Sequence, residues 1–185
     1  MEYKITTPVN RQMLSALRAG DRVYLSGVVY TMRDAAHKLL CEALERGEGS
    51  PYKLEGSAVY YVGPTPERPG QVIGSAGPTT SGRMDAYSPT LIDCGQLIMI
   101  GKGTRSAEVV DAIVRNGAVY LGAIGGAGAL MASSVVSCEI ICWPHLGCEA
   151  VRQLEVQDLP LTVVIDSQGG NLYNDGPARY LNSLK

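Results

Sequence analysis

The chain has few charged side chains and no concentration of one sign. Charged residues make up 18% of its 185 residues, against roughly 25% in an average soluble domain. The formal net charge is −2, and no basic block occurs in the sequence. Binding to a phosphate backbone requires a basic surface, so we expect no nucleic-acid partner. A surface poor in charge favours a chain that packs against another protein.

Two further absences concern membranes and secretion. No stretch approaches the roughly 18 uninterrupted apolar residues of a membrane-spanning helix, and the first residues, MEYKITTPVNRQM, contain no apolar core of a signal peptide. The five cysteines, an odd number, lie within apolar segments (Cys41, Cys94, Cys138, Cys142 and Cys148). Because nothing marks secretion, we expect reduced thiols in a cytoplasmic protein that has no membrane anchor.

Strand and helix patterns alternate along the chain, which predicts a single α/β domain over residues 1–185. Helical spacing covers residues 31–46, where Thr31 and Asp34 fit a capping box, and returns between Ser106, an expected N-cap, and Gly117. The tail, residues 171–185, is expected to be irregular apart from a final turn of helix. Apolar strand patterns occupy residues 21–30, 57–62, 97–101, 118–122, 133–143 and 159–170.

Glycine-rich turns raise the alternative of a phosphate-binding loop. Residues 122–128, GAIGGAG, lack the G-x-G-x-x-G spacing, and residues 74–83, GSAGPTTSGR, lack the lysine that ends a P-loop. Close packing of strand, turn and helix explains these glycines as well. Nucleotide binding is therefore the weaker interpretation.

Three cysteines near one histidine raise the alternative of a metal site. The spacings of Cys138, Cys142, Cys148 and His145 match no common zinc or iron–sulfur run. Cys138 and Cys142 lie four residues apart on an expected strand, so both should point to the same face. We interpret these cysteines as small buried side chains and predict no metal ligand in this chain.

Three cations lie at the boundaries of apolar elements. Arg33 opens a helix, Lys102 directly follows an apolar strand, and Arg83 lies on a turn beside Gly82. Each alone is typical of a solvated surface charge. Together, in a chain poor in charge, they fit a site for a small dicarboxylate, since arginine offers a bidentate fork and lysine a point charge.

Several motifs in order along nearly the whole chain resemble one family. They are RDAAHK (33–38), GPTTSGRMD (77–85), KGTRS (102–106), YLGAIGGAGAL (120–130) and residues 149–173. They are similar to the C-terminal domain, or β subunit, of class I fumarases and L(+)-tartrate dehydratases. The resemblance implies an α/β fold of the swivelling β/β/α type, with a mixed sheet and short helices.

The resemblance also implies a reaction and a partner. The activity would be reversible hydration of fumarate to L-malate, or the equivalent dehydration of tartrate. The family's [4Fe–4S] cluster is bound by a separate domain or α subunit, which implies an α2β2 assembly in which this chain binds no cofactor. A non-catalytic dicarboxylate-binding module remains an alternative of another class.

Residue roles follow from the matching motifs. They imply that Arg33, Arg83 and Lys102 bind the substrate carboxylates and that Thr79 is the catalytic base. A threonine hydroxyl is a very weak base, so nearby cations must favour its ionised form. Thr80 is either a further substrate-binding hydroxyl or a hydroxyl that bonds the local backbone.

Residues outside these roles keep more than one interpretation. His37, inside RDAAHK, either orients Arg33 or is simply buried on its helix. The stretch SCEIICWPHLGCEA, residues 137–150, departs from the family pattern and leaves the roles of His145 and Cys148 open.

Overall fold

The computed structural model describes residues 1–184. Its strands form one sheet in the order β1-β2-β3-β4-β5-β7-β6, and β2 also pairs with β7. The strands are β1 (Glu2–Thr6), β2 (Arg22–Thr31), β3 (Ala58–Tyr60), β4 (Ile98–Gly101), β5 (Val119–Gly122), β6 (Val135–Cys142) and β7 (Val151–Ile165). The α-helices are α1 (Arg11–Leu14), α2 (Asp34–Glu45), α3 (Ser88–Asp93), α4 (Ala107–Asn116), α5 (Gly128–Ser133) and α6 (Leu172–Ser183), and two short 3₁₀ helices are η1 (Ser81–Met84) and η2 (Pro144–Glu149).

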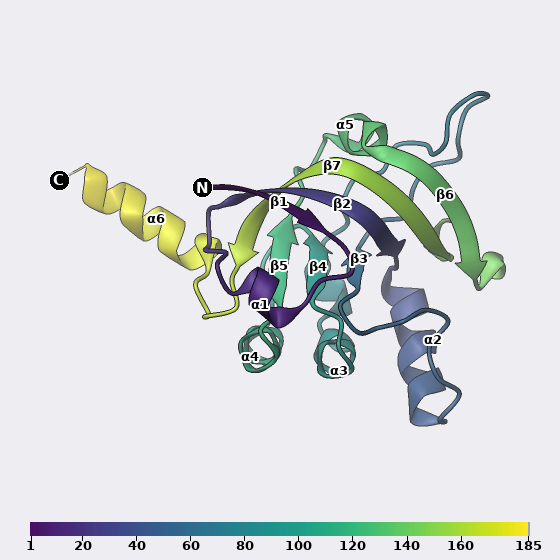
Figure 1. Ribbon diagram of the computed structural model, residues 1–185, viewed down its shortest axis with the longest axis horizontal. Coiled ribbons are helices and arrows are strands. Elements are labelled where there is room, and N and C mark those ends of the chain that lie inside the picture. The colour runs from purple at the N-terminus through teal and green to yellow at the C-terminus, as the bar shows by residue number, and fades with distance from the viewer. Residues whose placement is uncertain (185) are drawn as a thin grey trace.

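The sheet is mixed and closes on itself. Strands β1 to β5 pair in parallel, whereas β7 runs antiparallel to β5, β2 and β6. Because β7 pairs with β5 on one side and with β2 on the other, β2, β3, β4, β5 and β7 form a barrel-like ring. Figure 1 shows β2 and β7 curving together above the short strands β4 and β5, with α3 and α4 below. The predicted α/β fold with a mixed sheet and short helices is confirmed.

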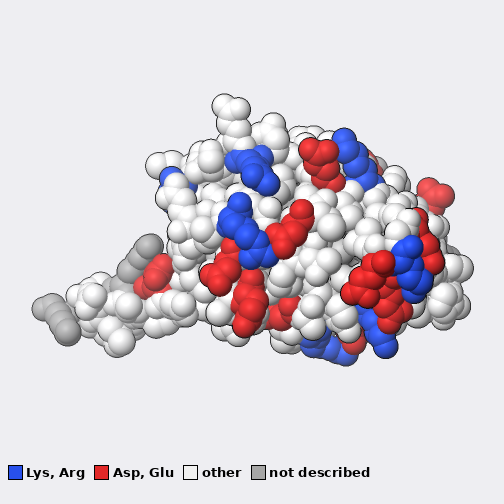
Figure 2. Space-filling view, turned by 90° about the horizontal axis from the view of Figure 1, so that it is seen from below, with Lys and Arg blue, Asp and Glu red and all other residues white. Residues whose placement is uncertain are grey.

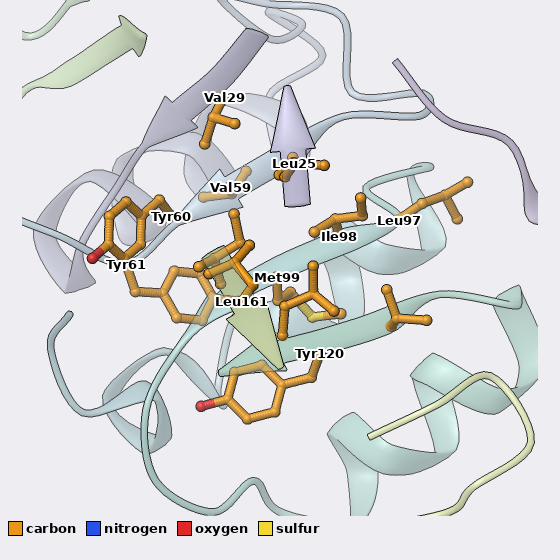
Figure 3. Packing of buried hydrophobic residues seen from close by; sticks show 14 of the residues in the cluster. Leu25, Val29, Val59, Tyr60, Tyr61, Leu97, Ile98, Met99, Tyr120 and Leu161 are labelled. Carbon is orange, nitrogen blue, oxygen red and sulfur yellow. The ribbon is translucent and has the colours of Figure 1, made fainter. Parts of the chain in front are cut away.

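The core consists of apolar side chains from all strands of this ring. Figure 3 shows Leu25, Val59, Ile98 and Leu161 packed together, and each is at most 4% exposed. Burial of apolar area is the main favourable term in folding. Tyrosines are unusually prominent in the core: Tyr60, Tyr61 and Tyr120 are among the largest fully buried side chains. Their hydroxyls require hydrogen-bond partners in the interior: Tyr60 bonds Ala76 O, Tyr61 bonds Ser88 Oγ, and Tyr120 bonds the turn described below.

Helix boundaries follow the sequence in one case and differ in another. For α4, both predicted ends are confirmed: Ser106 is the N-cap, and Gly117 ends the helix with φ +66°. The predicted capping box before α2 is wrong, because Thr31 is the last residue of β2 and its hydroxyl accepts from Arg152 N at 3.1 Å. Because Thr31 pairs with β7, it does not cap the helix, and Arg33 is the N-cap residue instead.

Residues 172–183 form a helix rather than an irregular tail with one helical turn. Asn171 caps α6 by accepting from Tyr173 N, and the helix projects from the body of the molecule (Figure 1). Strand β7 also begins at Val151, earlier than the predicted residue 159. Within residues 1–184, no helix combines the length and apolar character needed to cross a membrane.

Charge is dispersed on the face formed by the helices below the sheet. Figure 2 shows acidic and basic side chains side by side there, without a continuous basic stripe. Ion pairs such as Arg115 with Asp93, 2.6 Å apart, account for part of this pattern. The helix face therefore offers no concentrated charge of one sign.

Candidate functional site

The connections after four parallel strands meet at one sheet edge. Arg33 closely follows β2, Tyr61 directly follows β3, Lys102 directly follows β4, and Gly125 closely follows β5. Adjacent parallel strands place their carboxyl ends at the same edge, where α/β sheets commonly bind ligands. The sequence motifs RDAAHK, KGTRS and GAIGGAG therefore become neighbours in space.

The turn that contains Thr79 is hydrogen-bonded between two of these connections. Thr79 N donates to Tyr61 O at 2.8 Å. Ser81 N donates to Lys102 O at 2.9 Å, and Lys102 N donates back to Ser81 Oγ at 3.1 Å. Thr80 and Lys102 form a parallel bridge. The turn thus extends the sheet beyond β3 and β4, with Thr79 half-buried and Thr80 exposed.

Lys102 reaches across to the glycine-rich connection after β5. A methyl group added at Gly125 would lie 3.6 Å from Lys102 Cδ and 3.8 Å from Nζ. The side chain of Lys102 therefore runs along this connection, in van der Waals range of Gly125. Close packing explains the first and last glycines of GAIGGAG: a methyl group would lie 2.7 Å from Val164 Cγ2 at Gly122 and 2.9 Å from Gly77 N at Gly128.

The two site arginines belong to a row of alternating charges, Glu149–Arg33–Asp34–Arg83, here called the charge row. Arg33 Nη2 lies 3.1 Å from Glu149 Oε1 and 3.9 Å from Asp34 Oδ1. Arg83 Nη2 donates to Asp34 Oδ2 at 2.9 Å. The structure thus brings Arg83, from the turn, beside Arg33, from the start of α2. The predicted cations Arg33, Arg83 and Lys102 all lie at this sheet edge.

A buried hydroxyl network supports the turn from below. Ser81 Oγ lies 2.9 Å from Tyr120 Oη, and Tyr120 Oη donates to Gly103 O at 3.0 Å. Burial raises the pKa of the Tyr120 phenol, so this hydroxyl stays protonated and able to donate. The network ties η1 to the residue after Lys102. It fixes the turn and the lysine relative to each other.

Arg105, in the KGTRS motif, is a structural cation rather than a surface charge. Its side chain is fully buried, with Nε 2.6 Å from Asp85 Oδ1 and Nη2 donating to Ser88 Oγ at 2.7 Å. Its guanidinium carbon lies 5.3 and 5.1 Å from the ring centres of Tyr61 and Tyr120, within cation–π range. Arg105 thereby joins the strand ends under the site.

His37 is buried under the start of α2. It is 0% exposed, and its Nδ1 lies 2.8 Å from the carbonyl oxygen of Arg33, to which it donates in the neutral tautomer that this contact favours. Burial lowers the pKa of His37 to about 4. The burial of His37 is confirmed, and its ring bonds the backbone of Arg33; a role in orienting the Arg33 side chain stays a prediction.

Stability should depend on pH through His37. The unfolded chain takes up a proton near the ordinary pKa of 6.5 while the folded chain resists protonation until about pH 4. As the pH falls from about 8 to about 5, the free energy of unfolding should therefore drop by about 2 kcal/mol. Denaturant unfolding at several pH values measures this. The exposed His145→Gln variant should keep the slope and His37→Gln should flatten it; an unchanged slope in His37→Gln would contradict the assignment.

The cysteines do not converge on a metal-binding arrangement. Among residues 1–184, no group of three or more His, Cys, Asp or Glu side chains is placed to hold a metal ion. All five cysteines are unpaired, but the interpretation of Cys138, Cys142 and Cys148 as buried side chains is wrong, because the first two are half-buried and Cys148, like Cys94, is exposed. The expected common face of Cys138 and Cys142 is interrupted by a register shift between Ile140 and Cys142 in β6. The backbone around Cys148 instead contributes to the slot of Arg33, described below.

Comparison with known proteins places these features in a family. Residues 2–176 match the family model described as the fumarase C-terminus. The chain belongs to the fumarase C-terminal family. This confirms the resemblance drawn from the motifs.

Named relatives of this fumarase C-terminal chain are of two kinds. The aerobic class I fumarate hydratase of Salmonella typhimurium and fumarate hydratase 2 of Leishmania major are each 40% identical, over 88% and 89% of this chain but only 28% and 29% of the relatives. The chain therefore spans less than a third of their length. A putative L(+)-tartrate dehydratase subunit beta of Methanocaldococcus jannaschii is 36% identical, over 95% of this chain and 92% of the relative.

Several residues of this fumarase C-terminal site were missed by sequence reasoning. Asp34 and Asp85 lie inside the quoted motifs RDAAHK and GPTTSGRMD, and Arg105 lies inside KGTRS, yet none was given a role at the site; Asp34 was considered only as part of a helix cap. Glu149 is the first residue of the matched stretch 149–173, and no role at the site was predicted for it either. A charged residue beside a recognised ligand was the available signal for Asp34. No signal in the sequence marked Glu149, because its partner Arg33 is remote in sequence.

Proposed function

We propose that this chain is the β subunit of a two-subunit class I fumarate hydratase, which hydrates fumarate reversibly to L-malate. The observation that carries the proposal is the convergence of Arg33, Arg83 and Lys102 with Thr79 at one sheet edge. The fold and the family membership support the proposal. In the same proposal, the chain lies in the cytoplasm, a reducing compartment that suits its five unpaired cysteines.

Each of the four residues has a distinct role in the proposal. Arg33 and Arg83 bind the two carboxylates of the substrate through guanidinium hydrogen bonds, and Lys102 adds a point charge. Thr79 transfers the proton: its hydroxyl donates to the substrate carbon during hydration and its ionised form removes that proton during dehydration. The neighbouring cations stabilise the ionised form of Thr79. Thr80, exposed beside Lys102, contributes a further hydroxyl to the substrate.

The remaining half of the site belongs to a partner in this proposal. Following what the family resemblance implies, we assign the [4Fe–4S] cluster to an α subunit in an α2β2 assembly. When bound, such a cluster would supply Lewis-acid chemistry toward the substrate hydroxyl. The residues of this chain act from the opposite side, on the carboxylates and on the proton.

Reconstitution tests this division of labour. The isolated chain is expected to show no hydration of fumarate, because Thr79 and the cations alone do not activate water. Anaerobic mixing with the cluster-bearing subunit should restore turnover, followed by the absorbance of fumarate, and mass measurement should give α2β2. Full activity of the isolated chain, or no activity with a cluster-loaded partner, would refute the proposal.

A tartrate dehydratase β subunit is the second candidate. The alignment with the Methanocaldococcus jannaschii protein favours it, because that relative matches this chain over nearly its full length. Both reactions need the same carboxylate ligands and the same proton transfer. Comparing kcat/KM of the reconstituted complex for L-malate and L(+)-tartrate separates the two, since the better substrate identifies the reaction.

A further inference from the structure

The charge row contains two carboxylates that the proposed reaction does not use. Asp34 lies between the two arginines, within 3.9 Å of Arg33 and 2.9 Å of Arg83, and Glu149 lies 3.1 Å from Arg33 on the far side. We propose that Asp34 and Glu149 are positioning residues that hold the two guanidiniums as a preset pair for the two ends of a dicarboxylate. This inference rests on the proposed function and adds two residues to it.

Two neighbouring arginines require such support. Like charges at short range repel each other, and a long arginine side chain loses rotamer freedom when it is fixed. A carboxylate between the two guanidiniums offsets the repulsion and selects one orientation for each. A ligand that finds both arginines in place then binds without the cost of ordering them.

Helix α2 holds both carboxylates where they are. Asp34 is the first residue of the helix, and Glu149 Oε2 accepts from Ala35 N at 3.2 Å. Free N–H groups and the helix dipole favour negative charge at this end. Glu149 is therefore bonded to the helix backbone as well as to Arg33, whereas Asp34 is held by its place as the first residue of the helix and by its bond from Arg83.

The two arginines depend on the row to different extents. Arg33 lies in a narrow slot: a methyl group at Gly63 would come within 3.0 Å of its Cδ and Nη1 and within 3.1 Å of Cys148 O. Its side chain is 20% exposed, whereas that of Arg83 is 49% exposed. Packing holds Arg33 together with Glu149, but Arg83 relies on Asp34. We therefore expect Asp34 to matter most through Arg83.

Kinetics of the reconstituted complex test this role. Asp34→Ala should raise KM for the dicarboxylate about tenfold while kcat changes less than about threefold, because Arg83 loses its orientation before binding. Asp34→Asn keeps a hydrogen-bond acceptor and should recover much of the lost affinity. In an Arg83→Ala background, Asp34→Ala should raise KM much less than in the wild type, because the residue through which Asp34 acts is gone.

The matched control is Asp93→Ala, which removes the exposed ion pair to Arg115 before β4, at the other end of the strand from Lys102. It should leave KM unchanged. A lower KM in Asp34→Ala would overturn the proposal, since it would show that the carboxylate competes with substrate. Full additivity of the Asp34 and Arg83 changes would overturn it as well.

Binding of succinate, a dicarboxylate that cannot be hydrated, separates this inference from the proposed function. Calorimetric titration of the wild-type complex should detect binding, and Asp34→Ala should weaken it about as much as it raises KM. If the wild-type complex neither binds succinate nor turns over fumarate or tartrate, the proposed function fails. If the wild type binds and Asp34→Ala binds equally well, only the positioning role fails.

Discussion

Replacing Thr79 by valine in the reconstituted complex is expected to lower kcat by about 10²–10⁴-fold, the usual range for losing a general acid–base group, with KM changed less than about threefold. Valine matches threonine in shape, and the backbone N–H of Thr79 keeps its bond to Tyr61 O. The turn should therefore survive while only the hydroxyl is lost. The substrate still binds through its carboxylates, so the defect should appear in the proton transfer.

Two measurements check the Thr79 prediction. Steady-state kinetics of fumarate hydration gives kcat and KM, and exchange of deuterium from D2O into malate reports on the proton transfer alone. Thr90→Val, at an exposed position on α3, is the matched control and should behave as wild type. A Thr79→Val complex that retains wild-type kcat and exchange would show that another group moves the proton.

Replacing Arg83 by alanine should lower kcat/KM by roughly 30- to 5000-fold, equivalent to about 2–5 kcal/mol for truncating one partner of a charge pair. Arg83 is a half-exposed fork at the sheet edge whose Nη2 already bonds Asp34. Arg83→Lys should recover only part of the loss, because lysine supplies charge without the bidentate geometry. Thermal unfolding of the variants should change little, since the side chain lies outside the core.

The control for Arg83 is Arg46→Ala, which removes an exposed arginine paired with Glu48. It should leave kcat/KM unchanged. Should Arg83→Ala also leave kcat/KM unchanged, the site would not grip the substrate as proposed. The alternative of a non-catalytic dicarboxylate-binding module would then regain support.

Features set by short stretches of sequence could be predicted. The ends of α4 depend on a serine hydroxyl and on a glycine with positive φ, both local effects. Lys102 could be placed at a strand end because a short apolar run precedes it directly. The alternation of strands and helices indicated the α/β class, and the parallel order of the strands then placed the motif residues at one edge.

Features that depend on distant contacts could not be predicted. Glu149 meets Arg33 only because β7 returns beside β2 and brings η2 to the start of α2. The same strand pairing prevents Thr31 from forming its predicted helix cap. Helix α6 contains Gly176 and Pro177, both poor helix formers in the interior of a helix, so local propensity argued against it. The Asn171 cap stabilises only the first turn of this helix.

The charge row also bears on how quickly a substrate arrives. Its two cations and two anions cancel, so at a distance greater than about 8–10 Å the row contributes little field in physiological salt. In the proposed function, this leaves Lys102 as the main cation of this chain to attract an approaching dianion. The association rate of the substrate should therefore depend on diffusion and on its shape match to the site more than on electrostatic steering. Added salt should slow association only modestly.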